Sequence, residues 1–341
     1  MRSYEVPSTR APFGSILGNW YLRRYAPARE KAAGEFAARH QNCPGMEKYF
    51  TLICVQPGRW CSILLAQLRP LVVIKTGDER EMNSNSSKAR SPDMRAIQLE
   101  ICTASVEDCV KAERGGADRV ELNCALMLGG LTPTLGALRE ARAAVRLPII
   151  AMIRPRPAGF CYSPAEFAVM QRDAEAALSE KADGIAFGIL TAAGAVDVKR
   201  CRQMVKLTAG RQAVFHRAFD VVRDPLRALE QLIDLGLTRV MTSGQEASAY
   251  NGAANIAAYI RQAAGRIEIL PAGGINRFTV ADVIRRTSCN QVHASLSTTG
   301  KDSSASGRPQ VSFGGAVKQS EEQFTVTDAQ AVRRLRDLLA E

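Results

Sequence analysis

The sequence predicts an α/β fold, a TIM-type (β/α)8 barrel over residues 96–341, preceded by a poorly organised N-terminal extension over residues 1–95. Eight short β-branched or apolar runs recur after residue 95, and helical patterns lie between them. This alternation implies a parallel sheet with right-handed crossovers. The loop after the first run, "TASVED", contains no glycine, unlike the phosphate loop of many open sheets. Eight units in this length of chain favour a closed barrel.

The expected strands are the eight runs at residues 97–102, 119–123, 149–154, 184–190, 213–217, 239–243, 267–272 and 291–295. Helical stretches follow most of them, such as "SVEDCVKAERG" and "DPLRALEQLIDLG". Several helices open with a capping residue and an acid three positions later, as in Ser105 and Asp108, and several close at a glycine, such as Gly115 or Gly236.

The N-terminal 95 residues show no sustained helical or strand period. Residues 76–96, "TGDEREMNSNSSKARSPDMRA", have the composition of a linker, so we place the domain boundary near residue 95 and expect the extension to be disordered or loosely structured. Acidic residues Glu5, Glu30 and Glu35 argue against a mitochondrial presequence. The apolar stretch at residues 62–74 is too short to span a bilayer, so we expect no membrane partner.

Charge and cysteine content narrow the functional classes. The formal charge of +11 is concentrated in residues 1–93, which hold 14 Lys/Arg against 8 Asp/Glu. The rest of the chain has no run of five basic residues and no basic segment interleaved with aromatics, so we expect no nucleic-acid partner. Nine cysteines without a CxxC pattern indicate reduced thiols. We therefore expect a cytoplasmic protein, and a homo-oligomer.

The first two expected strands end in polar residues. Side chains alternate along a strand, so Glu100 and Cys102 share one face, and Glu121 and Asn123 share another. The intervening residues Leu99, Ile101, Val120 and Leu122 suit packing against outer helices. The polar pairs are therefore expected to point into the barrel mouth, where the chemistry of such barrels lies.

Other strand ends add charged and small residues to the same mouth. The third ends at Arg154 and Arg156, two positions apart, and the sixth ends at Ser243. Gly273 and Gly274 follow the seventh strand, where backbone N–H groups often hold a phosphate, and the eighth strand carries His293.

The fifth strand ends in "FHRAFD", which contains the most chemically suggestive group of the chain. His216 suits proton transfer near neutral pH, Asp220 is placed to orient it, and Arg217 is a further substrate-binding candidate. The alternative is that Asp220 pairs with Arg217 and caps the next helix.

Several long motifs resemble the CutC family. They are "LEICTASVEDCVKAERGGADRVEL", "GGLTPTLG", "IIAMIRPRPAGFCYS", "FHRAFDVVRDPLRALEQLIDLGLTRVMTSGQ" and "ILPAGGI", and the resemblance covers about residues 97–340. It implies a TIM-type barrel and a role in copper homeostasis. In animal members, Cu(I) binding is attributed to two cysteines at the ends of the first two strands, and the first of these positions corresponds to Cys102.

The second position departs from the family pattern. Where that pattern reads Glu-Leu-Cys, this chain has Glu121, Leu122 and Asn123, with Cys124 one place later. Cu(I) favours soft thiolates, and an amide does not replace one. A one-residue shift turns a strand side chain to the opposite face, so Cys124 contributes only if it swings in from a loop.

Two hypotheses remain open at this stage. In the first, the protein binds Cu(I) through Cys102, with Cys124 or Cys161 as the second candidate ligand. In the second, it is an enzyme acting on a small phosphate or carboxylate compound. Arg154 and Arg156 then hold the anion, His216 acts as acid or base, and Glu100 or Glu121 is its partner.

Overall fold

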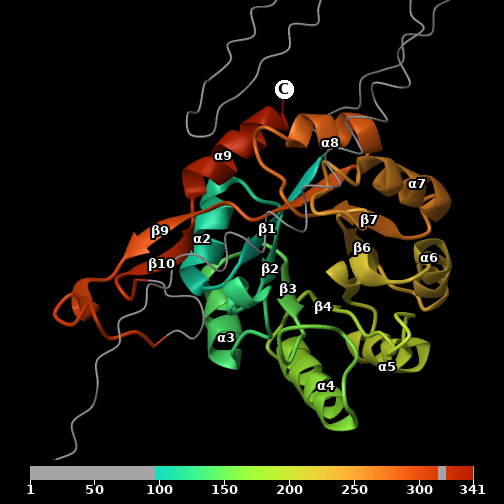
Figure 1. Cartoon of the computed structure of the whole chain (residues 1–341), viewed down its shortest axis with the longest axis horizontal. Coiled ribbons are helices and arrows are strands. Elements are labelled where there is room, and N and C mark those ends of the chain that lie inside the picture. Colours follow the sequence, from blue (N-terminus) through green and yellow to red (C-terminus); the bar gives the residue numbers. More distant parts are fainter. Residues whose placement is uncertain (1–96, 314–319, 341) are drawn as a thin grey trace, which may run out of the picture. The chain divides into compact units, whose positions relative to one another are not determined.

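The computed structural model describes residues 97–313 and 320–340. The predicted extension at residues 1–95 lies outside these ranges, and the domain boundary stays a prediction. The described chain forms the predicted barrel (Figure 1). Eight parallel strands pair in the order β7-β6-β5-β4-β3-β2-β1-β8, and a parallel bridge between Ala272 and His293 brings the last two strands together.

All eight predicted strands are present, most of them shorter than the apolar runs that predicted them. Their bounds are β1 Gln98–Thr103, β2 Arg119–Leu122, β3 Ile149–Met152, β4 Gly184–Phe187, β5 Gln212–Phe215, β6 Arg239–Thr242, β7 Glu268–Pro271 and β8 Gln291–Ala294. The polar residues that continue several runs, such as Arg154 and His216, therefore lie just beyond the strands, in the loops that form the mouth.

Helices follow the strands and surround the barrel, as Figure 1 shows. They are α2 Val106–Gly115, α3 Leu135–Ala144, α4 Pro164–Ser179, α5 Val198–Thr208, α6 Pro225–Asp234, α7 Ala253–Ala263, α8 Val280–Thr287 and α9 Ala329–Leu338. Short 3-10 turns lie at η2 Leu126–Leu128, η3 Arg217–Val221 and η4 Ser303–Ala305.

The predicted helix boundaries follow from local capping. Ser105 accepts a hydrogen bond from the Asp108 N–H at 3.0 Å and so satisfies a free donor at the start of α2. At the other end, Gly116 has a φ of 90°, a left-handed conformation that costs glycine little. Its N–H hydrogen-bonds back to the carbonyls of Ala112 and Glu113, and the helix stops there.

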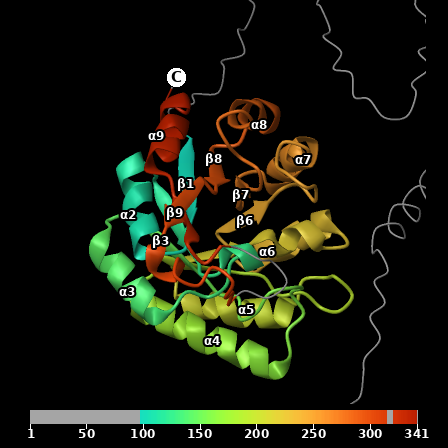
Figure 2. The ribbon, with the colours of Figure 1, turned by 60° about the vertical axis from the view of Figure 1, so that its left-hand side comes forward.

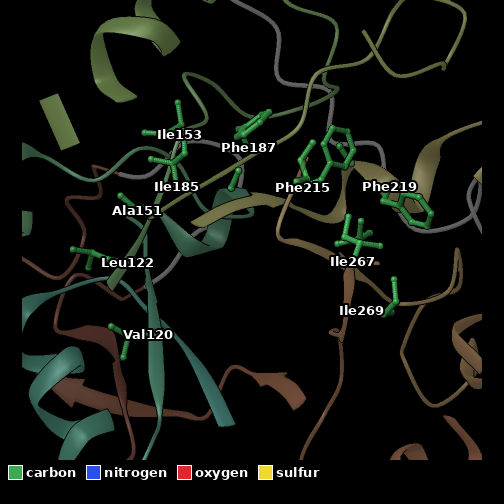
Figure 3. Close-up of a cluster of buried hydrophobic side chains, with 14 of the residues drawn as sticks. Val120, Leu122, Ala151, Ile153, Ile185, Phe187, Phe215, Phe219, Ile267 and Ile269 are labelled. Carbon is green, nitrogen blue, oxygen red and sulfur yellow. The ribbon is translucent and has the colours of Figure 1, made fainter. Parts of the chain in front are cut away.

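The main hydrophobic core lies between the strands and the helices, not inside the barrel. Leu99, Ile101, Val120 and Leu122 are fully buried in it, which confirms the predicted outward face of β1 and β2. Figure 3 shows Val120 and Leu122 in one cluster with Phe187 and Phe215 of β4 and β5. Because these side chains face outward, the alternate residues of each strand face the barrel interior.

The barrel interior is divided into an apolar and a polar part. Apolar side chains of β3 to β7 form two small buried clusters, which contain Ile150, Met152, Ala186 and Val214, and Met241, Leu270 and Ala272. Strands β8, β1 and β2 instead contribute buried polar residues, among them Glu100, Arg119, Glu121, Gln291 and His293. Arg239 of β6 is also buried, and it hydrogen-bonds Gln291 of this polar part.

A C-terminal hairpin was not predicted. Strands β9 Ser297–Lys301 and β10 Gln323–Thr327 follow β8 and precede α9, pair antiparallel and project from the barrel (Figure 1). Figure 2 shows the molecule turned so that β9 faces the viewer. Helix α9 then packs against α2, where a Cβ at Gly115 would lie only 2.6 Å from Val332 Cγ1. Within the described ranges, no helix is both long and apolar enough to cross a bilayer.

Candidate functional site

A charged layer deep in the barrel supports the site. Arg119 of β2 forms a buried ion pair with Glu100 of β1 and donates through Nη2 to Gln291 Oε1 at 3.0 Å. Arg239 of β6 donates to the same Gln291 oxygen at 3.1 Å. Burial alone would raise the pKa of Glu100, but the Arg119 charge and the His293 hydrogen bond outweigh it and hold that pKa below its usual range. Glu100 is therefore a carboxylate.

His293 stands directly above this layer on β8. Its Nδ1 lies 2.7 Å from Glu100 Oε1, and its ring also hydrogen-bonds the Cys102 side chain. Burial disfavours the imidazolium, but these hydrogen bonds and the charges of Glu121 and Glu100 raise the pKa of His293 well above the usual histidine value. The imidazole is thus held in one orientation by a buried carboxylate.

Cys102, Glu121 and His293 form a cluster of possible metal ligands. One ligand atom from each residue lies within 4.8 Å of the others. Burial raises the pKa of both the Cys102 thiol and the Glu121 carboxyl. A metal ion binding here would displace protons, because ligation requires the deprotonated forms.

Asn123, which occupies the position of the family's second cysteine, lies against this cluster. Its Nδ2 donates to Glu121 Oε2 at 3.1 Å and to Cys102 Sγ at 3.6 Å. The amide therefore acts as a hydrogen-bond donor to the sulfur. It is not placed as a second soft ligand.

The cluster opens into a cavity of about 390 Å³ at the mouth of the barrel. Cys102, Glu121, Asn123 and His293 line one part of it. The other lining residues are Leu126, Gly129, Gly130, Met152, Arg154, Phe160, His216, Arg217, Met241, Ala272, Gly273, Gly274, Ile275, Asn276 and Ser295. Most of the predicted site residues are thus brought together at one end of the barrel.

His216 lines this cavity, but Asp220 does not orient it. His216 Nδ1 accepts the Ala218 N–H at 3.1 Å, and burial together with the Arg154 charge lowers the pKa of His216 to about 3. Asp220 instead binds the Arg217 Nε at 2.8 Å and the N–H and hydroxyl of Ser243. The expected His–Asp pair is corrected in favour of the alternative Arg217–Asp220 pair, because the carboxylate lies toward β6.

The two arginines of the third strand end are not a pair. Arg154 is buried and lines the cavity, whereas Arg156 is absent from the lining and forms an ion pair with Glu166 on α4. Both lie in the loop after β3, where strict strand alternation no longer applies. The expectation that both arginines bind one anion is corrected on this point.

Three further predicted residues lie outside the cavity lining. Glu100 lies beneath the cavity, in the charged layer, and Ser243 is held by Arg217 and Asp220 beside it. Cys124 also turns away, since its thiol donates to the Thr132 carbonyl at 3.1 Å and its backbone bridges to Leu131. The structure thus groups Glu121 and His293, and not Cys124, with Cys102 as possible metal ligands.

Several lining residues were missed by the sequence reasoning. Met152 lies two positions before Arg154, so the period of two along β3 could have found it. The same period along β2 could have found Arg119, which lies in the charged layer and not in the lining. Met241 follows the same rule on β6. Phe160 lies in a loop, and no local pattern identifies it.

Comparison with known proteins agrees with this architecture. The CutC family profile matches residues 97–298. A CutC family protein of Treponema denticola is 46% identical over 233 residues, which cover 68% of this chain and 95% of that protein. The human "Copper homeostasis protein cutC homolog" is 39% identical over 258 residues, covering 74% of this chain and 94% of its own length.

A solved structure shares both the fold and sequence similarity. The crystal structure of the putative copper homeostasis protein CutC from Streptococcus agalactiae is 31% identical, with a TM-score of 0.56. The match covers 58% of this chain and 97% of that one. By its sequence match and its barrel, the chain belongs to the CutC family.

Proposed function

We propose that the protein serves copper homeostasis by binding Cu(I) at the barrel mouth, through the Cys102 thiolate and the His293 imidazole. The observation that supports this is the juxtaposition of Cys102, Glu121 and His293, with one ligand atom of each within 4.8 Å. The human relative is named a copper homeostasis protein, and the chain covers almost all of that relative. These names do not favour the alternative of an enzyme for a small anionic substrate.

The donor set suits a soft ion. Thiolate and thioether sulfurs select Cu(I), and imidazole is a common copper ligand. Met152 and Met241 bring two thioethers into the lining of the same cavity as Cys102. Glu121 is a harder donor, and we infer that it is not a ligand of the copper ion. Copper is the cargo in this proposal.

Glu100 has a positioning role in this site. Its carboxylate engages His293 Nδ1 at 2.7 Å, which leaves Nε2 as the nitrogen available to an ion. Metal-binding histidines commonly donate their second N–H to a carboxylate, which fixes the tautomer and the ring orientation. The buried ion pair with Arg119 keeps that carboxylate charged.

The affinity is expected to be weak for a copper site. Asn123 replaces the second cysteine and donates a hydrogen bond to Cys102 Sγ, so only one thiolate is available. Cys124 is hydrogen-bonded to Thr132 and lies outside the cavity lining. A single thiolate supported by an imidazole is a weaker Cu(I) donor set than two thiolates.

Location and assembly belong to the same proposal. All six cysteines in the described ranges are free, which is consistent with the reducing environment of the cytoplasm. We infer a cytoplasmic, homo-oligomeric protein. Light scattering after size-exclusion chromatography tests the homo-oligomeric state, and a monomer at micromolar concentration contradicts it.

Competitive Cu(I) titration with a chromophoric chelator tests the copper proposal. We expect Cys102→Ser and His293→Asn to weaken Cu(I) binding about tenfold or more, since each removes a ligand. Cys161→Ser is the matched control, because that cysteine is exposed and outside the cavity lining. Equal affinities for Cys102→Ser and the wild type refute the site.

A further inference from the structure

We propose that the cavity also holds a small hydroxylated organic anion, whose carboxylate or phosphate group lies among Arg154, His216 and Arg217. These three residues line the same cavity as Cys102 and His293. The inference rests on the contacts of Arg154, on the tautomer of His216, and on the polar atoms of the lining that have no partner within the protein.

Arg154 is a buried cation without a counter-ion. It is only 8% exposed, and its Nη1 donates to the carbonyls of Leu128, Gly129 and Gly130 at 3.3, 3.0 and 3.1 Å. Its Nη2 donates to the Ala158 carbonyl at 2.8 Å. Within residues 97–313 and 320–340 it makes no ion pair, and its buried Nε has no hydrogen-bond partner. Buried charges in proteins are normally paired, so an anion is the expected partner.

His216 adds a second unused donor. Its Nδ1 accepts the Ala218 N–H, so in the neutral ring the proton sits on Nε2. The Nε2 atom is buried and has no hydrogen-bond partner within the described protein. The low pKa of His216 keeps the ring neutral at physiological pH. It therefore carries an N–H donor whose hydrogen bond is not made within the described protein.

Phe160 holds these two donors at one wall. Its ring centroid lies 5.1 Å from that of His216 and 5.2 Å from the Arg154 Cζ. Both polar groups therefore pack on the same aromatic side chain, which ties the loop after β3 to the end of β5. Both residues, from the loops after β3 and β5, thus line one wall of the cavity.

Arg217 also lines the cavity, and its guanidinium is ion-paired with Asp220. Its Nε and Nη2 are held by Asp220 and Ser243, both at 2.8 Å, which fixes the plane of the guanidinium. A Cβ on Gly273 would lie 3.4 Å from Arg217 Nη1, and Gly273 has a φ of 94°. The glycine thus allows the guanidinium to lie close to the backbone of the loop after β7.

The rest of the lining defines the remainder of the ligand. Glu121 Oε1 is a third buried atom without a partner within the described protein, and it suits hydrogen bonding to a hydroxyl group. Leu126, Met152 and Ile275 offer an apolar wall for a short carbon skeleton. A volume of about 390 Å³ lies within the range of pockets for small metabolites. Hydroxy acids and phosphate esters of polyols share these features.

Thermal denaturation and calorimetry of the metal-free full chain test the proposal. The probes are glycolate, glycerol 3-phosphate and inorganic phosphate, with glycerol as the uncharged control. We expect at least one organic anion to raise the melting temperature and to bind with a measurable heat, while glycerol does neither. Absence of binding by all three anions, or equal effects of glycerol, overturns the proposal.

Substitutions locate the site. Arg217→Met and Arg154→Lys should each weaken anion binding about tenfold or more, since a hydrogen bond to a charged group contributes about 1.5–3 kcal/mol. Arg156→Met is the matched control, because it removes an arginine from the same loop as Arg154 but outside the cavity lining. If Arg154→Lys fails to fold, Arg217→Met and His216→Phe decide, and unchanged affinity in both overturns the assignment.

Discussion

Glu100 Oε1 and His293 Nδ1 lie 2.7 Å apart in the barrel interior, although the two residues are 193 positions apart in the sequence. They meet because β8 pairs with β1, with Glu100 opposite His293 in the register. The same carboxylate is ion-paired with Arg119 on β2. One buried acid therefore connects the charged layer of the barrel to the candidate copper ligand.

Replacing this acid should destabilise the fold. Glu100→Gln leaves Arg119 buried without its carboxylate, and breaking a buried pair in this way costs about 3–5 kcal/mol. Urea unfolding measures the change in the free energy of unfolding. Glu175→Gln, which removes an exposed ion pair with Arg172, should change it by less than about 0.5 kcal/mol. A similar small effect at Glu100 would show that the buried pair is not needed for stability.

Restoring the family's second cysteine should strengthen copper binding. Asn123 Nδ2 lies 3.6 Å from Cys102 Sγ, so a thiolate at position 123 falls next to the first. We expect Asn123→Cys to bind Cu(I) about tenfold or more tightly, because soft thiolates select this ion. Competition titration measures the affinity. Asn251→Cys, which adds a thiol at an exposed position, serves as the control, and equal gains in both variants count against the site.

Acid should destabilise the protein partly through His216. Its pKa is about 3 in the folded protein, because burial and the Arg154 charge disfavour the imidazolium, and about 6.5 in an unfolded chain. Between these values the unfolded chain binds a proton that the folded chain does not, so stability rises with pH. The contribution of neutral His216 to the free energy of unfolding is fully present above about pH 6.5 and is lost as the pH falls toward 3.

The variant His216→Asn removes the contribution of His216 to the pH dependence of the free energy of unfolding. Asparagine can still accept the Ala218 N–H at the start of η3, so the local hydrogen bond is kept. Unfolding free energies measured from pH 7.5 to 4.5 should fall less steeply for the variant than for the wild type. Parallel curves would show that His216 does not remain neutral in the fold.

The aromatic core outside the barrel should be sensitive to truncation. Phe187 is fully buried and lies edge-on to Phe215, with ring centroids 6.4 Å apart. Phe187→Ala should cost about 3–5 kcal/mol through lost burial and the cavity left behind. Phe278→Ala, at a side chain that is 76% exposed, should cost less than about 0.5 kcal/mol in the same denaturation experiment. Equal costs would contradict the assignment of the core.

The barrel should fold without the N-terminal segment. A chain that begins at Met94 retains all eight strands and the helices around them. We expect it to be soluble and to unfold cooperatively in a thermal melt. If this chain is insoluble or lacks a cooperative transition while the full chain folds, the boundary near residue 95 is wrong.

The sequence by itself determined the barrel and the inward face of its strands. Strand and helix periods are local properties, so alternation along β1 and β2 placed Glu100, Cys102, Glu121 and Asn123 inside without knowledge of the rest of the chain. The resemblance to the CutC family likewise depends only on motifs in the chain. The barrel and the membership of the CutC family were confirmed. The outward packing of Leu99, Ile101, Val120 and Leu122 was confirmed as well.

Only the tertiary structure decided which polar groups meet. Barrel closure brings His293 to Cys102, and the paths of the loops direct Asp220 to Ser243, Arg156 to Glu166 and Cys124 to Thr132. These partners depend on strand register and loop conformation, which arise from packing over the whole chain. Local periodicity assigns a side chain to a face of a strand, but it carries no information on the atom that the side chain finally reaches.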